Sequence, residues 1–209
     1  MTGLIALIDW SILMSMVHQD TRSALISAGL RAMLHGGYDS VGIAGVLTQT
    51  GVPKGSFYHY FDSKEAFGCA IVVEYGERWR AIRRTTFERT DLSPLDRLDR
   101  HFDELEDDVM TQKVLSGCLL GNLSQLLASR SEPLRQAIEA AFDEWQEDLS
   151  RVLETALQVG ELPNNADPDE TAALVIEAYE GALLRAKAQA SRAPLVRFRT
   201  RSLPLLLGK

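Results

Sequence analysis

The stretch GVPKGSFYHYFDSKEAFG at residues 51–68 decides the fold. Gly51 permits a sharp turn, and Pro53 suits the first position of a helix, so PKGSFYHY is predicted to be a short helix. Another short helix is expected just before it, capped by Ser40 and carrying apolar residues between positions 43 and 47. Two short helices joined by a glycine-bearing turn have the proportions of a helix-turn-helix.

The second helix of such a motif lies in the major groove of DNA. Gly55 leaves out a side chain where the backbone must approach DNA closely, whereas Phe57 and Tyr60 are expected to face the core with Val52 and Phe61. The side chains predicted to point outward can donate to phosphates or base edges: Lys54, Ser56, Tyr58 and His59. For so short a helix, a surface helix of mixed polarity is the alternative.

The rest of the chain is predicted to be helical. Residues 20–35 carry apolar side chains at the spacing of a buried stripe, which Gly36-Gly37 ends. An Asp62-x-x-Glu65 box is expected to open the next helix, Ser116 to cap a later one, and Pro204 to break the last. Capping residues, prolines and glycines delimit helices at about 63–88, 94–111, 118–128, 131–160, 167–191 and from 194.

These boundaries predict an all-α protein in two domains. A three-helix N-terminal domain with the helix-turn-helix occupies residues 18–62, and a C-terminal domain of about six helices occupies residues 63–209. Residues 1–17 form an apolar N-terminal extension. They are interpreted either as an extended reading-frame start, with Met14 or Met16 as the true beginning, or as a small added helix.

The charge distribution allows DNA contact without demonstrating it. The net charge is −7, but residues 18–66 hold four basic and four acidic residues, so the excess acid lies elsewhere. A sequence-independent architectural DNA-binding protein, the alternative function, needs many basic contacts, and the acidic C-terminal domain argues against it.

Other classes are excluded on content. The chain has no plausible Ser/His/acid set, phosphate loop or metal-ligand cluster, so neither an enzyme nor a cofactor or metal site is expected. Its two cysteines, Cys69 and Cys118, fit a reducing, cytoplasmic compartment. The apolar start lacks the features of a signal peptide, and no segment approaches transmembrane length, so no membrane partner is expected.

The helix-turn-helix segment resembles the TetR/AcrR family of transcriptional regulators. The family pattern Gly-x-x-Lys-Gly-x-x-Tyr-x-x-Phe is matched here at residues 51–61, and Ser63-Lys64-Glu65 follows it. Gly117-Cys118-Leu119 and Ala186-Lys187 are similar to the branch of repressors that respond to N-ethylmaleimide and acrylate. The resemblance extends from about residue 18 to the end.

The resemblance implies a repressor that binds a palindromic double-stranded DNA operator as a homodimer and responds to a small-molecule effector. It implies base or groove contacts for Lys54 and Ser56. Phosphate contacts are implied for Tyr58, His59, Lys64 and Ser40. Lys64 also lies at a helix N-terminus, where backbone N–H groups favour a phosphate.

Cys118 is the candidate for ligand or redox sensing. It is predicted to lie about two positions into a helix, whose N-terminus lowers a thiol pKa. Asn122 and Gln125 follow at i+4 and i+7 on one face. The resemblance adds Lys187 as a cation that can lower the thiol pKa further. The alternative is a small buried hydrophobe, which is also the interpretation of Cys69.

Small residues on the predicted 167–191 helix permit close packing: Ala178, Gly181, Ala182, Ala186 and Ala188. The family resemblance implies dimerisation through this helix, and packing against the 131–160 helix is the alternative. The larger aromatic residues of the C-terminal domain are expected to form its core or a pocket wall: Trp79, Phe87, Phe102, Phe142, Trp145 and Tyr179.

Overall fold

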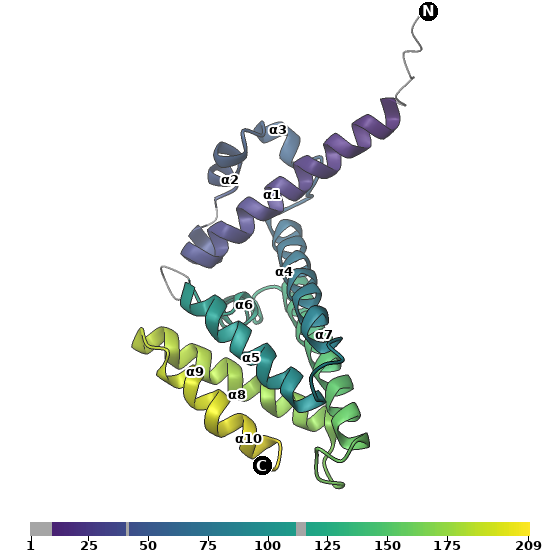
Figure 1. Cartoon of the computed structure of the whole chain (residues 1–209). Helices are drawn as coiled ribbons and strands as arrows, with labels where there is room; N and C mark the ends of the chain where they lie inside the picture. The colour runs from purple at the N-terminus through teal and green to yellow at the C-terminus, as the bar shows by residue number, and fades with distance from the viewer. Residues whose placement is uncertain (1–9, 41, 112–115) are drawn as a thin grey trace, which may run out of the picture. The chain divides into compact units, whose positions relative to one another are not determined.

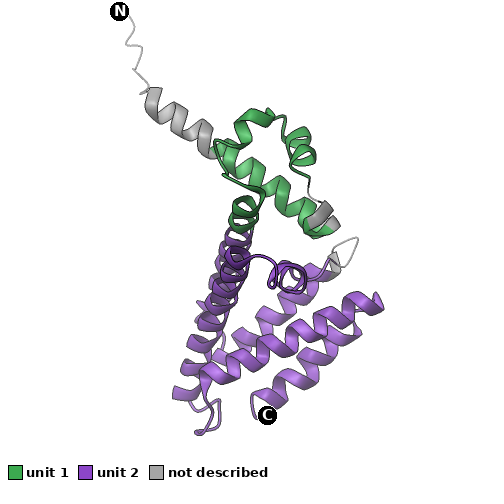
Figure 2. Ribbon diagram, turned by 180° about the vertical axis from the view of Figure 1, so that it is seen from behind, with its two compact units in different colours: residues 1–71 green, residues 72–209 purple. Residues whose placement is uncertain are grey.

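The computed structural model describes residues 10–40, 42–111 and 116–209, with side chains except at 10–19, 35–36, 39–40 and 110–111. Every regular element in this part of the chain is helical, which confirms the all-α prediction (Figure 1). The chain divides into unit 1, Met1–Ile71, and unit 2, Val72–Lys209 (Figure 2). The division falls within α4, Lys64–Phe87, whose first turns belong to unit 1.

Unit 1 begins with α1, Trp10–Ser40, followed by α2, Ile43–Thr50, and α3, Lys54–Phe57. The second half of the apolar extension is therefore continuous with α1, and its remainder, residues 1–9, lies outside the described residues. Gly37 interrupts α1 with φ 73° and ψ 171°, as expected from the glycine pair. Gly51 ends α2 in the left-handed region at φ 69°, as the turn requires.

Three local predictions in unit 1 are wrong. The N-cap of α2 is Gly42, not Ser40, because the helix begins later than the capping pattern suggested. The α4 cap is Ser63, whose Oγ accepts a hydrogen bond from the Ala66 N–H at 3.0 Å, so Asp62 does not fill this role. The predicted helix PKGSFYHY is helical only to Phe57 and then turns.

An aromatic cluster forms the core of unit 1. The ring centroids of Phe57, Phe61 and Phe67 lie 4.7–5.4 Å apart. Gly29 of α1 faces this cluster so closely that a Cβ there would lie 2.5 Å from Phe67 and 2.6 Å from Ile71. Because Phe67 and Ile71 pack in this core, unit 1 extends beyond the predicted boundary at residues 62/63.

Unit 2 takes in the remainder of α4 and the helices that follow. They are α5 (Pro94–Thr111), α6 (Leu119–Leu127), α7 (Glu132–Gln158), α8 (Pro168–Gln189), α9 (Ala193–Arg197), η1 (Phe198–Ser202) and α10 (Leu203–Leu206). Two of the predicted helix starts carry side-chain caps: Ser131 Oγ accepts from the Leu134 N–H at 3.2 Å, and Asp167 accepts from two backbone N–H groups of α8. No described helix is long and apolar enough to cross a membrane.

Two boundaries in unit 2 differ from prediction. Cys118 is the N-cap of α6 rather than a residue inside it, and no side chain caps this helix, so the role predicted for Ser116 is wrong. Pro204 does not break the last helix. The wide turns of η1 precede it and α10 continues from there, because a proline in the first turn has no backbone bond to lose.

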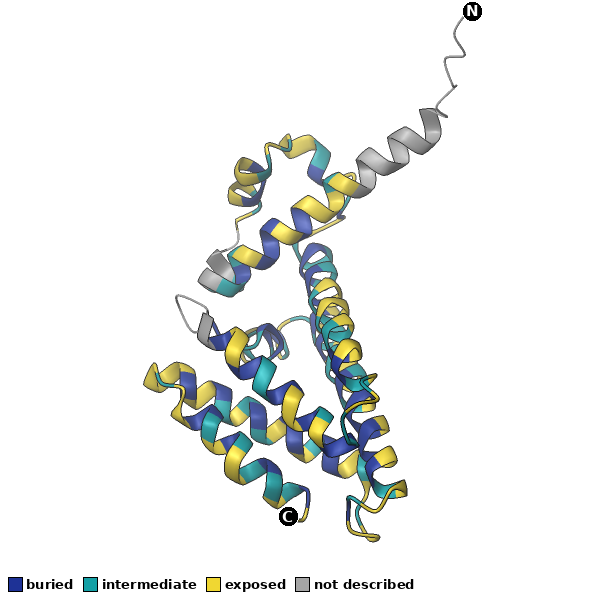
Figure 3. Cartoon of the chain, viewed as in Figure 1, coloured by how far each residue is buried: buried dark blue, intermediate teal, exposed yellow. Residues whose placement is uncertain are grey.

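Buried faces of α5, α7 and α8 form the core of unit 2 together with the C-terminal segment (Figure 3). Of the aromatic residues left open between core and pocket wall, Phe102, Trp145 and Tyr179 are buried in this core. The other three, Trp79, Phe87 and Phe142, pack partly buried against its edge. His101 lies between Phe87 and Phe102 with 1% exposure, and neither of its ring nitrogens has a hydrogen-bond partner.

Candidate DNA-binding surface and thiol site

The turn around α3 separates outward polar groups from an inward anchor. Phe57 is fully buried, whereas Lys54, Gly55 and His59 are exposed. Tyr58 is 53% exposed, and its ring meets the edge of the Phe57 ring. Ser56 and Tyr60 are half-buried, so Tyr60 faces the core only in part. The predicted outward and inward positions are therefore confirmed for Lys54, Tyr58, His59 and Phe57, whereas Ser56 and Tyr60 are intermediate.

Short-range backbone bonds hold this turn. The Ser56 N–H donates to Pro53 O at 2.9 Å, the His59 N–H to Ser56 O at 3.2 Å, and the Tyr60 N–H to Phe57 O at 2.9 Å. These i to i+3 bonds tighten the chain after α3. As a result Phe57 and Phe61 both enter the core, while the residues between them face outward in part.

Gly55 lies at the open side of this surface. A Cβ built there meets nothing within 4 Å, in contrast to Gly29. The fold of unit 1 therefore does not need a glycine at position 55. A glycine there gives another molecule access to the backbone, as its predicted role in DNA binding requires.

Two cations flank aromatic rings in unit 1. Lys64, at the start of α4, holds its Nζ 4.5 Å from the centroid of the Tyr38 ring. Arg22 of α1, which was not among the predicted site residues, lies over the Phe61 ring at 5.4 Å. The side chain of Ser40, another predicted phosphate contact, lies outside the described residues.

The thiol of Cys118 faces a carboxylate and a phenol. Tyr75 of α4 holds its hydroxyl oxygen 3.8 Å from Sγ. The Glu180 carboxyl of α8 lies beside the same helix start, because a Cβ added at Gly121 would lie 2.6 Å from Glu180 Oε2 and 3.9 Å from Cys118 Cβ. Burial is the largest cause that raises the pKa of Cys118, and the negative charge of Glu180 raises it further. The predicted lowering of this pKa is therefore wrong, because Cys118 caps its helix beside a carboxylate.

The pKa of Glu180 is also raised. Burial raises the pKa of its carboxyl to about 7, against a smaller opposing effect of the nearby Cys118 thiol. Its Oε1 is buried without a hydrogen-bond partner. Both pKa values are raised, so near neutral pH the Cys118 thiol keeps its proton and the Glu180 carboxyl is partly protonated.

Lys187 lies beside this pair but bonds elsewhere. Its Nζ donates to Asn122 Oδ1 at 3.1 Å, and Asn122 Nδ2 donates to Ser116 O at 2.8 Å. The Lys187 chain also passes Gly117, where an added Cβ would lie 3.4 Å from Lys187 Cδ. Three of the predicted sensing residues therefore gather around the 116–118 segment, whereas Gln125 is exposed on α6.

Tyr75 and Glu180 are two groups of this site that were not predicted from the sequence. Glu180 precedes Lys187 by seven residues, a spacing that puts both on one face of a helix. That spacing gave a usable signal once Lys187 was considered. Tyr75 had no such signal, because it approaches Cys118 from a helix 43 residues earlier in the chain.

Family comparisons agree with this geometry. Residues 25–67 match the family described as "Bacterial regulatory proteins, tetR family", and residues 94–201 match "Tetracyclin repressor-like, C-terminal domain". The chain belongs to the TetR family. It is thus a DNA-binding transcriptional regulator and not an enzyme.

Individual relatives of this TetR-family chain are similar along most of its length. It is 35% identical to transcriptional regulator AcuR of Cereibacter sphaeroides over 184 residues, which cover 88% of this chain and 82% of that protein. It is 30% identical to the transcriptional repressor NemR of Escherichia coli, over 84% of this chain and 88% of that one.

Solved structures show the same fold. The regulatory protein TetR from Rhodobacter sphaeroides superposes with a TM-score of 0.81 at 35% identity, covering 88% of this chain and 97% of that one. Escherichia coli NemR in its reduced form superposes with a TM-score of 0.81 at 29% identity, covering 87% and 94%.

The TetR-family chain leaves an apolar stripe uncovered on α8. Leu174 and Leu184 are 44% and 52% exposed, and Gly181 and Ala188 are also exposed. Ala178, one turn before Gly181, is half-buried. These positions recur at helical spacing, so they share one face of α8.

Proposed function

We propose that this protein is a one-component repressor that releases its operator when a small molecule acts on unit 2. The observation that carries the DNA-binding role is the α3 surface, where Lys54, Gly55, Tyr58 and His59 are exposed above a fully buried Phe57. A rigid aromatic core presents these donors in one arrangement, which sequence-selective contact with base edges requires.

Each residue of the surface has an assigned contact. Lys54 and Ser56 contact bases or the groove, and Gly55 lets the backbone approach. The phosphate contacts are assigned to Tyr58, His59, Lys64 and Ser40.

Gel shifts with DNA upstream of its own gene, with and without competitor, test this assignment. Tyr58→Phe and Lys64→Ala should weaken binding to all sequences, whereas Lys54→Ala should also relax sequence preference, by about 1–3 kcal/mol for a bidentate base contact. Wild-type binding by all three folded variants would refute the assignment. An equal shift on any DNA would favour an architectural protein instead.

We infer a homodimer formed through the exposed stripe of α8. Leucines alternating with small residues allow two helices to approach closely and bury apolar surface. Two copies of unit 1 would then occupy a palindromic operator whose half-site centres lie about 34–36 Å, or a multiple of that, apart.

Gly181→Phe tests this interface. A Cβ at this position meets nothing within the chain, so the variant should weaken the dimer and operator binding together. Sedimentation equilibrium of the variant and wild type measures this, and a monomer that keeps full operator affinity contradicts it.

We propose that Cys118 responds covalently to an electrophile, with Glu180 as the proton acceptor. A thiol whose pKa is raised forms little thiolate by itself, so it needs a base within hydrogen-bond reach. With an α,β-unsaturated carbonyl compound, Sγ bonds to the β-carbon while the thiol proton passes to the Glu180 carboxylate. The proton then moves to the α-carbon, so no further reactant is needed.

Mass spectrometry of the intact protein during alkylation tests this step. Cys118→Ser should bind operator but ignore the electrophile, whereas Cys69→Ser should respond normally. Glu180→Gln should slow alkylation if Glu180 takes the proton; faster alkylation would show that its charge only suppresses the thiolate. Lys187→Met should loosen the Asn122 contact and alter the rate less than Glu180→Gln.

A further inference from the structure

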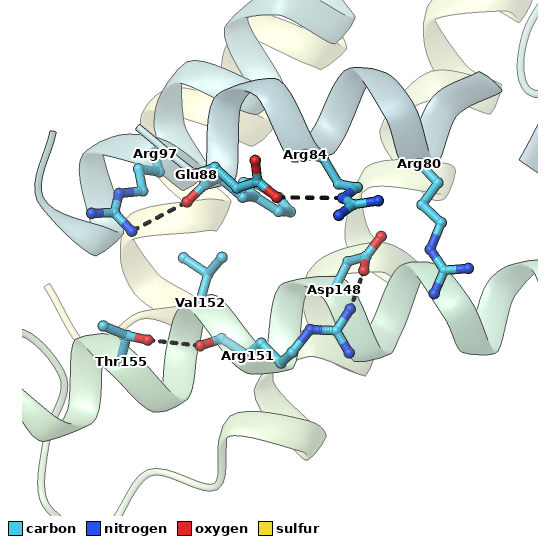
Figure 4. Close-up of a pocket in the computed structure, with 9 residues that line it drawn as sticks. Arg80, Arg84, Glu88, Arg97, Asp148, Arg151, Val152 and Thr155 are labelled. Atoms are coloured by element: carbon cyan, nitrogen blue, oxygen red, sulfur yellow. Dashed lines mark hydrogen bonds and ion pairs between the residues drawn. The ribbon is translucent and has the colours of Figure 1, made fainter. Parts of the chain in front are cut away.

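A groove in unit 2 is lined by more cations than carboxylates. Its volume is about 550 Å³, within the range of small-molecule sites. Side chains of α4 and α7 face each other across it, with Arg97 at one end and Arg80 at the other (Figure 4). Four arginines and two carboxylates line it: Arg80, Arg84, Arg97, Arg151, Glu88 and Asp148.

The carboxylate of Asp148 is already paired with two arginines, Arg83 and Arg151. Arg83, which is buried, donates to Asp148 Oδ2 through Nε at 2.9 Å and pairs through Nη2 at 2.8 Å. Arg151 bonds the other oxygen of Asp148 and also pairs with Glu147 at 3.9 Å. Neither oxygen is therefore left to offset the remaining arginines.

The other arginines are held only weakly by carboxylates. Arg84 pairs with Glu88 at 3.4 Å, and both side chains are 69% exposed, so water screens the pair. Arg97 instead donates to the backbone carbonyls of Leu92 at 3.1 Å and Phe87 at 3.2 Å, which fix its guanidinium at the groove's end. On the rim, Arg80 pairs with Glu144 at 3.4 Å. A ligand carboxylate can replace the exposed Glu88 and Glu144 at small cost.

The groove also has an apolar wall. Phe87 and the buried Val152 line it between the charged side chains, and Phe87 is held edge-on against His101 at 5.0 Å. Arginine forks match the planar geometry of a carboxylate, and the wall suits a small hydrocarbon group. The surplus of arginines over carboxylates in the lining, on a chain of net charge −7, favours an anionic ligand.

We infer that this groove binds a small organic carboxylate. The carboxylate lies between Arg84 and Arg97, and its apolar part rests on Phe87 and Val152. The site is distinct from Cys118 and requires no covalent step. A link between ligand binding in the groove and release of DNA rests on the proposed function, and it is measured separately from binding.

Calorimetry with benzoate, and with benzamide as its uncharged isostere, tests the inference on the full chain. Benzoate should bind and benzamide should not, and raising the salt from 50 to 300 mM should weaken benzoate binding several-fold. Equal heats from both compounds, or no heat from benzoate, would overturn it.

Variants locate the binding in the groove. Arg84→Gln should weaken benzoate binding about fivefold, and Glu88→Gln, which removes a competing carboxylate, should strengthen it about twofold. Arg135→Gln is the matched control, since Arg135 is also paired at i+4 on an exposed surface but lies outside the lining. A change with Arg135→Gln equal to that with Arg84→Gln would refute the location.

Operator release is then followed by fluorescence anisotropy of labelled DNA. Benzoate that binds by calorimetry but leaves the DNA complex intact supports the groove and argues against this ligand class as the effector. Benzoate that gives no heat refutes the groove, whatever the anisotropy shows. The two failures are therefore distinguishable.

Discussion

The two candidate sites of this protein are built in opposite ways. In unit 1 the functional groups stand exposed above a core made by their own neighbours, Phe57 and Phe61. In unit 2 the thiol of Cys118 meets groups from helices far away in sequence, Tyr75 and Glu180. The first site depends on which side chains face outward, and the second on what surrounds a buried atom.

The largest expected effect comes from substituting two glycines of unit 1, one packed against the core and one on the open surface. Gly29→Val should cost about 3 kcal/mol of unfolding free energy, because even the first added carbon overlaps the fully buried Phe67 and Ile71. Gly55→Val should leave stability within about 0.5 kcal/mol, because a Cβ there meets nothing. Urea unfolding measures both.

Operator affinity separates the two variants further. Gly29→Val should lose DNA binding in proportion to its unfolded fraction, whereas Gly55→Val should lose it while remaining folded. A folded Gly55→Val that binds operator like wild type would show that DNA does not approach this backbone.

How far prediction succeeds follows the same contrast. The helix-turn-helix could be predicted because turn glycines, aromatic spacing and outward donors all lie within one short stretch, residues 51–68. Its details failed where capping had to be assigned: Gly42 begins α2 in place of Ser40, and Ser63 caps α4. Several residue types can cap a helix, so sequence alone does not choose among neighbours.

The thiol site could be predicted only in part. Cys118, Asn122 and Lys187 do gather, but the sign of the pKa shift was wrong because it depends on Glu180 and on burial. Neither is a local property of the α6 sequence. The arginine groove was missed for the same reason, since its residues come from three helices and are unremarkable within each one.

Glu180 provides the second test, through the pH dependence of stability. Burial raises its pKa from 4.5 to about 7, so the folded state keeps the carboxyl protonated where the unfolded chain has lost the proton. Its contribution is complete below the unfolded pKa and is lost as pH rises from about 4.5 to 7. After allowance for partial exposure, the loss should be about 2 kcal/mol.

Glu180→Gln should remove this loss. Thermal unfolding of wild type and variant between pH 4 and 8 measures the difference, with Glu132→Gln as an exposed control, because the pKa of Glu132 is lowered by Arg135 instead. Parallel curves for wild type and Glu180→Gln would mean that the carboxyl is solvated in solution.

His101 gives the smallest and most specific test, because its shift has the opposite sign. Burial lowers its pKa from 6.5 to about 3, so the ring stays neutral in the folded state. The stability this group contributes is present above pH 6.5 and is lost as pH falls towards 3, where the unfolded chain takes up the proton first.

Both ring nitrogens of His101 are also buried without partners, which costs free energy at any pH. His101→Phe keeps the edge contacts with Phe87 and Phe102, so it should gain about 1 kcal/mol at pH 7 and more at pH 5. Differential scanning calorimetry at the two pH values measures both gains. A gain that does not grow between pH 7 and pH 5 would show that His101 takes up a proton as readily in the folded protein as in the unfolded chain, and would contradict the burial of this ring.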